Sequence, residues 1–161
     1  MAEQGLTYEE EEELHALLML ERADRAKESL LDFAMSVDVP GVPAEEGETE
    51  LDDADRDEYT VTRVEPALHH RVMIEALEAL EAKKIRRLML FLPPGSAKST
   101  YTSVIFPPWF LGRRAGRSLI CASYGDRLPK KFGRRCRTLV QTHEYGQIMN
   151  CGLGRQTKAV D

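Results

Sequence analysis

Residues 85–103 read IRRLMLFLPPGSAKSTYTS, and this stretch decides the expected fold. The apolar run 88–92 is typical of a buried strand, and it stops at Pro93-Pro94. A turn of small residues, 95–97, follows, and the pattern after it can begin a helix. A strand, a tight small-residue loop, a Lys-Ser/Thr pair and a helix together form the arrangement that holds a nucleoside triphosphate.

The candidate phosphate-binding residues are Gly95, Ser96, Ala97, Lys98, Ser99 and Thr100. In such a loop the backbone N–H groups and the helix N-terminus face the anion. Lys98 can reach the β- and γ-phosphates, and the Ser99 hydroxyl can bind Mg²⁺. The usual pattern has glycine before the lysine and again five positions earlier, where this chain has Ala97 and Leu92. An ordinary strand-to-helix turn with a solvent-facing Lys98 therefore stays open as the alternative.

Charge divides the 161-residue chain into two parts, although its formal net charge is only −5. Residues 1–58 hold 20 acidic and 4 basic residues, a net charge of −16. Residues 59–161 hold 7 acidic and 18 basic residues, a net charge of +11. The basic part can attract phosphate-rich partners, either a nucleotide or a nucleic acid, through its long-range field. The alternative for any single Lys or Arg is that it only solvates a helix face.

The three cysteines, Cys121, Cys136 and Cys151, have no CxxC spacing, so no zinc site is expected. Cys121 lies in an apolar run and is expected to be buried. An odd cysteine count without a secretory signal fits a reducing cytoplasm. No stretch approaches the roughly 20 apolar residues that span a bilayer, so a soluble intracellular protein without a membrane partner is expected.

The composition predicts three regions. Residues 1–36 form an N-terminal helical segment, which begins at Thr7 with acids in its first turn. Residues 37–58 carry two prolines, two glycines and mostly acids, so they are expected to be an acidic flexible linker. Residues 59–161 are expected to form a truncated P-loop ATPase domain.

Within the third region the pattern predicts a short extended piece at 59–64 and an amphipathic helix at 66–83, and then alternating strands and helices. Strands are expected at 86–92 and 118–124, with a helix from 99 to 110 that Pro107-Pro108 breaks. A last helix is expected from Asp126 to about Gln141. This order favours an α/β fold with a partial parallel sheet of the P-loop NTPase type. The buried face of helix 66–83 is expected to consist of Val72, Ile74, Leu77 and Leu80, with Glu75, Glu78 and Glu81 outside.

The segment PPGSAKSTYTSVIFPPWFLGRRAGRSLICASYGDRLPKKFGRRCRTLV resembles the N-terminal ATPase region of terminase large subunits from tailed phages and prophages. The resemblance covers roughly residues 59–150 and implies a motor ATPase that drives DNA into procapsids. It implies that ATP and Mg²⁺ are the cofactors, with Lys98 as the main phosphate contact and Ser99 as the magnesium contact. Other members carry an Arg where this chain has Gly95, so the cation of the transition state is unassigned. His69 and His70 would lie near the adenine, and an exposed pair at a helix start is the alternative.

The same resemblance implies double-stranded DNA, the terminase small subunit and the portal as partners in the cytoplasm of a bacterial host cell, and a ring oligomer for full-length members. Such proteins continue with a strand that ends in Asp-Glu and with a nuclease domain, and no such pattern follows Val140 here. The chain is therefore expected to be a truncated terminase that hydrolyses ATP poorly alone, and its catalytic residues are unknown.

The sequence has two alternative functional interpretations. A small P-loop kinase would need a second acidic strand and an acceptor pocket, and the sequence shows neither. A basic nucleic-acid-binding fragment without a nucleotide role is the main alternative, and strongly salt-dependent binding would favour it. Its phosphate contacts would come from Arg113, Arg114, Arg117, Lys130, Lys131, Arg134 and Arg135.

Overall fold

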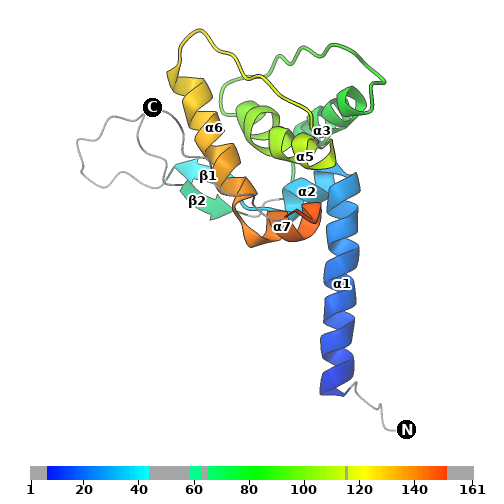
Figure 1. Cartoon of the computed structure of the whole chain (residues 1–161). Coiled ribbons are helices and arrows are strands. Elements are labelled where there is room, and N and C mark those ends of the chain that lie inside the picture. The colour runs from blue at the N-terminus through cyan, green and yellow to red at the C-terminus, as the bar shows by residue number, and fades with distance from the viewer. Residues whose placement is uncertain (1–6, 44–58, 63–64, 115, 152–161) are drawn as a thin grey trace, which may run out of the picture.

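The computed structural model describes residues 7–43, 59–62, 65–114 and 116–151, and the described part is mostly helical (Figure 1). One small sheet lies among these residues, an antiparallel pair of strands in which Val39 lies opposite Thr62. The elements are α1 (Tyr8–Glu28), α2 (Leu30–Ser36), β1 (Val39–Pro43), β2 (Tyr59–Thr62), α3 (Leu68–Glu81), α4 (Lys98–Thr100), the π-helical turn η1 (Tyr101–Ile105), α5 (Phe106–Arg113), α6 (Arg127–Val140) and α7 (His143–Met149).

The prediction of a partial parallel sheet is wrong. The expected strands at 86–92 and 118–124 belong to no sheet in the described residues. The short extended piece expected at 59–64 is confirmed over 59–62 by β2, and residues 63–64 lie outside the described part. In the first stretch Leu88, Leu90 and Leu92 pack against the core. Met89 and Phe91, which alternate with them, are 77% and 83% exposed. A parallel sheet is normally covered on both faces, whereas this segment is covered on one face only.

Side-chain caps fix where α1 begins and where α2 follows it. The Thr7 hydroxyl accepts a hydrogen bond from the Glu10 N–H, and the Glu10 carboxylate accepts one from the Thr7 N–H, so α1 begins with a capping box. Ser29 ends α1 and begins α2, because its hydroxyl accepts from the Asp32 N–H at 3.2 Å. Two successive helices therefore meet at a single serine.

Side chains from α3 and α5 hold this corner in place. The last carbonyls of a helix lack partners within the helix, and here the indole Nε1–H of Trp109 donates to the Ala26 carbonyl at 3.2 Å. Arg113 donates to the Lys27 carbonyl, which puts a positive charge at the C-terminus of α1. The Glu78 carboxylate accepts from the first N–H of α2, on Leu30, at 2.6 Å. The acidic N-terminal part of the chain is therefore joined to the basic part by specific contacts that are buried or part-buried.

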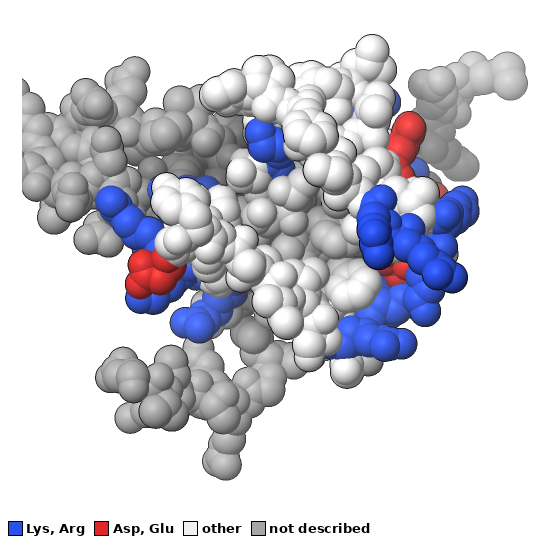
Figure 2. Space-filling view, turned by 90° about the horizontal axis from the view of Figure 1, so that it is seen from above, with Lys and Arg blue, Asp and Glu red and all other residues white. Residues whose placement is uncertain are grey.

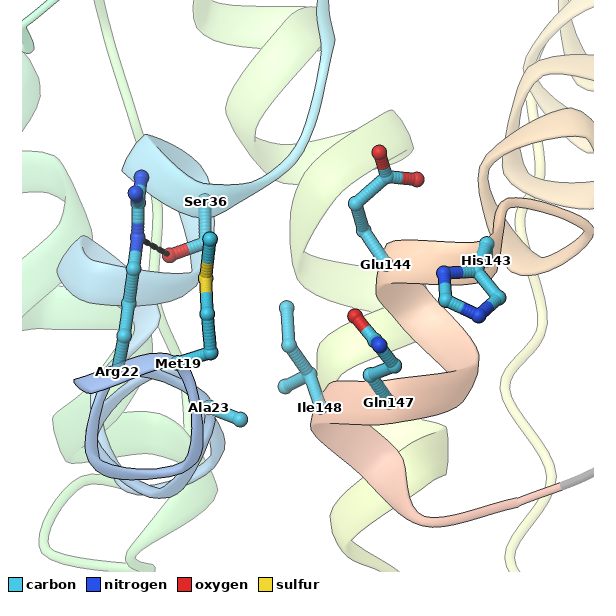
Figure 3. Close-up of a pocket in the computed structure, with 8 residues that line it drawn as sticks. All are labelled: Met19, Arg22, Ala23, Ser36, His143, Glu144, Gln147 and Ile148. Atoms are coloured by element: carbon cyan, nitrogen blue, oxygen red, sulfur yellow. Dashed lines mark hydrogen bonds between the residues drawn. The ribbon is translucent and has the colours of Figure 1, made fainter. Parts of the chain in front are cut away.

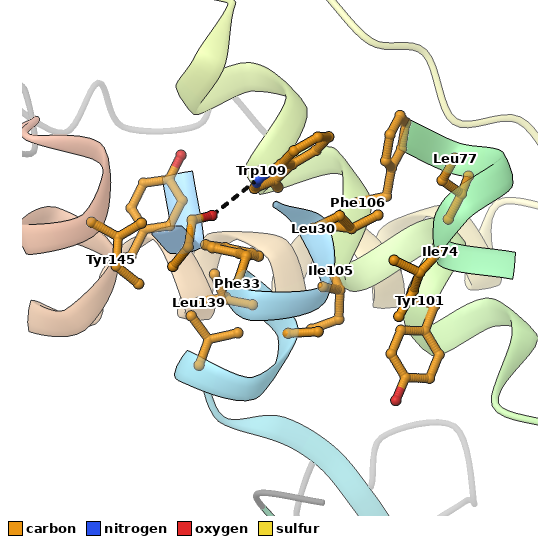
Figure 4. Close-up of a cluster of buried hydrophobic side chains, with 14 of the residues drawn as sticks. Leu30, Phe33, Ile74, Leu77, Tyr101, Ile105, Phe106, Trp109, Leu139 and Tyr145 are labelled. Atoms are coloured by element: carbon orange, nitrogen blue, oxygen red, sulfur yellow. Dashed lines mark hydrogen bonds between the residues drawn. The ribbon is translucent and has the colours of Figure 1, made fainter. Parts of the chain in front are cut away.

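The main core lies where α2, α3, η1, α5 and α7 meet (Figure 4). Trp109, Phe33, Leu30, Ile74 and Ile105 are among its largest fully buried side chains. The two ring systems of Phe33 and Tyr145 meet edge to face at 6.2 Å between centroids. The core thus combines residues from both sides of the acidic segment 44–58, which lies outside the described residues together with most of the expected linker.

The helix after the loop is not broken at Pro107-Pro108. It runs without interruption from Lys98 to Arg113 through η1. The two prolines have no N–H for the carbonyls of Ser103 and Val104, four residues earlier. The Cys136 thiol of α6 lies 3.2 Å from the first of these oxygens and 3.6 Å from the second. A π-helical turn and a thiol donor together allow the prolines inside this helix.

Three further details differ from the sequence prediction. On α3 the buried positions are Met73, Ile74, Leu77 and Glu81, whereas Val72 is 61% exposed. The Glu81 carboxylate is buried because Arg114 Nε lies 2.7 Å from it, and Arg113 Nε lies 3.7 Å away. Cys121 is exposed rather than buried, because its segment enters no sheet.

Candidate phosphate-binding loop

The candidate loop turns sharply between the extended segment and the long helix. Gly95 has φ = 79° and Ala97 has φ = 51°, so both lie in the left-handed region. Glycine adopts that region without cost, whereas alanine pays roughly 1–2 kcal/mol. Ala97 therefore stands in a backbone conformation that explains why the common pattern has glycine before the lysine. Local strain of this kind is found frequently at functional sites.

Lys98 spans the two ends of the loop. Its Nζ donates to the Leu92 carbonyl at 3.0 Å, while its backbone opens the helix. The Ser96 hydroxyl donates to the Pro93 carbonyl at 2.8 Å, which fixes the turn from within. Lys98 is half-buried rather than free in solvent, so the alternative of a solvent-facing lysine does not describe its position.

The helix that begins at the loop offers its first backbone N–H groups to the loop side. The N–H groups of Lys98, Ser99 and Thr100 precede the first helical hydrogen bond, from the Tyr101 N–H to the Ala97 carbonyl at 3.2 Å. These donors and the positive end of the helix dipole favour an anion. Ser99 is exposed, and its hydroxyl is therefore accessible to a solvated cation beside such an anion.

His70 lies beside the loop, next to Tyr101 and the Ser96 backbone. Its ring lies 4.8 Å from the Tyr101 ring and 3.9 Å from the His69 ring, between centroids. Burial and the neighbouring His69 lower the pKa of His70, and a hydrogen bond with the Ser96 backbone opposes this shift. Its Nδ1 accepts from the Ala67 N–H at 3.3 Å, so the Ser96 contact belongs to the other ring nitrogen. Tyr101 is the one member of this group that the sequence analysis did not single out.

The predicted basic residues do not form one surface. Lys and Arg side chains gather on two opposite sides of the face in Figure 2. Arg113 and Arg114 form ion pairs with Glu81 at the junction of α3 and α5, so these two side chains stabilise the fold. Lys130, Lys131, Arg134 and Arg135 lie together on α6, with Arg127 and Arg137 on the same side of the helix. Within this group Lys130 pairs with Asp126 at 2.7 Å, and this ion pair holds the pKa of the Asp126 carboxyl below its usual value.

Two hollows in the described part lie away from the loop. One, of about 210 Å³, separates α1 and α2 from α7, with Arg22 and Met19 on one side and His143 and Gln147 on the other (Figure 3). Arg22 donates from Nε to the Ser36 hydroxyl at 3.4 Å, so it is partly engaged. The other hollow, of about 370 Å³, lies between α3 and α5 beside Glu78. Neither hollow brings together a set of groups that defines a reaction.

No family model, curated protein or solved structure matches this chain. Among the described residues there is no group of three or more His, Cys, Asp or Glu side chains that could hold a metal ion. None of the described helices combines the length and the apolar character needed to cross a bilayer.

Proposed function

We propose that this chain binds the phosphates of a nucleoside triphosphate, Mg-ATP, through residues 95–100. The observation that carries the proposal is the geometry of Lys98, which opens a 16-residue helix and extends its ammonium across the loop to the Leu92 carbonyl. A phosphate needs only to replace that carbonyl as the partner of the ammonium. The proposal depends on the loop and the helix, and it requires no parallel sheet.

Each residue has a definite role in this binding. The N–H groups at the start of the helix donate to phosphate oxygens, and Lys98 neutralises their charge. The Ser99 hydroxyl would hold Mg²⁺, which supplies further neutralisation of the phosphates when it is bound. Gly95 and Ala97 set the turn that brings these groups to one point. ATP hydrolysis is outside the proposal, since no residue is assigned to orient an attacking water.

The wider setting follows from the sequence resemblance. We propose that the phosphate site belongs to the ATP-binding part of a terminase large subunit, with double-stranded DNA, the small subunit and the portal as partners in the host cytoplasm. The basic stripe on α6 is compatible with a DNA partner, and the loop is compatible with a motor that binds ATP.

Thermal unfolding with and without Mg-ATP tests the phosphate site. A ligand at 100 times its dissociation constant stabilises the folded state by about 2.7 kcal/mol, so the midpoint should rise by several degrees. Lys98→Ala should abolish this rise. Lys131→Ala, which removes an equal charge from α6, should keep it. If Lys98→Ala gains as much stability from Mg-ATP as the unmodified chain does, the site is elsewhere.

One observation favours a second candidate, nucleic-acid binding by α6. Its basic side chains occupy one side of the helix, while Leu139 and Cys136 on the other side pack inward. Such a stripe follows a phosphate backbone through electrostatic contacts. Arg127→Ala combined with Arg137→Ala should weaken duplex binding and reduce its salt dependence by about two units of slope. Binding that Mg-ATP leaves unchanged would separate this function from the phosphate site.

A further inference from the structure

The N-terminal half of α1 projects from the body of the protein (Figure 1). The helix has 21 residues and extends for about 30 Å. Every residue from Tyr8 to Arg22 is exposed, and Ala26 near the other end is the buried residue of this helix. The projecting residues therefore gain little stability from the rest of the described chain.

This projecting half carries an apolar cluster that is unusual on a free helix. Leu14, Leu17, Leu18 and Leu20 are between 45% and 64% exposed. A lone helix of about 12–15 residues is marginal in water, and most helices in proteins are stabilised by packing of an apolar face. Contiguous exposed apolar side chains are typical of surfaces that take part in interactions.

The direction of the cluster follows from helix geometry. Each residue turns the helix by about 100°, so positions three, four and seven apart share a side. Ala23 and Ala26 face the body, and Leu14, Leu17 and Leu18 lie on the opposite side. Glu10 and Arg25 lie on that outer side too. Along the helix, the outer side thus carries Glu10, the three leucines, Glu21 and then Arg25.

When a second copy of the helix is placed beside the first in the opposite direction, the acid of each copy lies opposite the base of the other. Glu10 precedes Leu17 by seven residues, and Arg25 follows Leu18 by seven. We propose that α1 binds α1 of a second copy in an antiparallel pair whose two-fold axis passes between Leu17 and Leu18. In this pair the leucines of both copies meet at the centre, and Glu10 of each copy lies opposite Arg25 of the other. Such an interface is closed and symmetric, so the chain forms a dimer.

Sedimentation of the whole chain over a range of concentrations tests the dimer. The unmodified chain should pass from monomer to dimer. Leu17→Gln combined with Leu18→Gln should raise the dissociation constant at least about 100-fold, because four leucines lose their apolar contact. Val72→Gln, at an exposed valine of α3, is the control and should change nothing. Unfolding of the core by denaturant checks that the leucine variant is still folded.

Cross-linking tests the orientation, in a background with Cys121→Ser and Cys151→Ser. Leu14 and Glu21 lie on the outer side, three residues before Leu17 and three after Leu18. A mixture of Leu14→Cys and Glu21→Cys chains should form a mixed disulfide dimer under oxidation faster than either chain alone. A parallel pair would instead cross-link each variant with itself, and this result would overturn the proposal.

Two other results would also refute the antiparallel pair. The chain could stay monomeric at all concentrations, or it could associate through α6, in which case Arg127→Glu and not the leucine variant would separate the copies. Lys98→Ala should leave the dimer intact, so this proposal and the phosphate site fail or hold separately.

Discussion

At the scale of single residues, Ala97 is the clearest case of a strained backbone conformation that the loop requires. Its positive φ is needed for the turn that directs Lys98 across the loop. From the sequence alone, the missing glycine is only a departure from the usual pattern. In the structure Ala97 adopts the left-handed conformation that glycine adopts without cost.

Replacement of this alanine by glycine should stabilise the protein. Ala97→Gly relieves a left-handed alanine, and the gain should exceed the extra entropy of glycine in the unfolded chain, for a net effect of about 1 kcal/mol. Denaturant unfolding measures the change. A loss of stability would show that position 97 does not adopt the left-handed conformation in solution.

Cys136 is a second residue whose role depends on a distant part of the chain. It donates toward carbonyls that Pro107 and Pro108 leave without partners. Cys136→Ala should cost about 1 kcal/mol, because it leaves a partly buried oxygen unsatisfied. Cys136→Ser keeps a donor and should lose less. Equal losses in urea unfolding of the two variants would mean that only the volume of the side chain matters.

At the scale of elements, two helical glycines should respond in opposite directions to the same substitution. A Cβ on Gly112 of α5 would lie 2.5 Å from Met149 Sδ and 2.9 Å from the Tyr145 hydroxyl. Overpacking typically costs 1–3 kcal/mol, so Gly112→Ala should destabilise by about 1 kcal/mol despite the better helix propensity of alanine.

Gly133 of α6 provides the matched control. A Cβ there would meet nothing within 4 Å, and the residue is exposed. Gly133→Ala should therefore stabilise by about 0.5–1 kcal/mol. Thermal unfolding of both variants compares the two signs directly. A stabilising effect of Gly112→Ala, like that of Gly133→Ala, would mean that α5 and α7 do not pack as described.

The helices could be predicted from the sequence, because caps and apolar periodicity are local signals. Thr7 and the glutamates of the first turn indicate where α1 begins. The helices expected at 66–83 and 126–141 have nearly the expected bounds. The sequence could not reveal that segment 86–92 stays outside any sheet in the described part. An apolar run such as 88–92 has the same pattern whether or not a neighbouring strand pairs with it. The continuity of the helix through Pro107 needed knowledge of the Cys136 thiol, about 30 residues away. The loop was recognisable from its residue order, whereas the contact of His70 with Tyr101 depends on how α3 packs.

At the scale of the whole molecule, one buried group, Tyr145, and two half-buried groups, His70 and Cys136, define the pH range of greatest stability. The pKa of His70 lies below its usual value of 6.5, so the folded state prefers the neutral ring and loses stability as the pH falls below 6.5. Burial raises the pKa of Cys136 from 9.0 to about 11 and that of Tyr145 from 10.0 to about 12. The folded state prefers both groups protonated, so stability falls as the pH rises above about 9.

Unfolding midpoints should therefore be highest between about pH 6.5 and 9. His70→Gln should reduce the decline on the acid side, and Cys136→Ser should reduce the decline that begins near pH 9. A midpoint that is flat from pH 5 to pH 10 in the unmodified chain would contradict the burial of these groups.

Trp109 gives the molecule a built-in optical probe. It is the only tryptophan in the chain, it is 1% exposed, and its indole donates to the end of α1. Its emission therefore reports on the junction between the two oppositely charged parts of the chain. It does not respond to changes around the projecting N-terminal half of α1. A red shift on dilution would signal that the junction opens. Dissociation of a dimer held together by α1 would leave the emission spectrum unchanged.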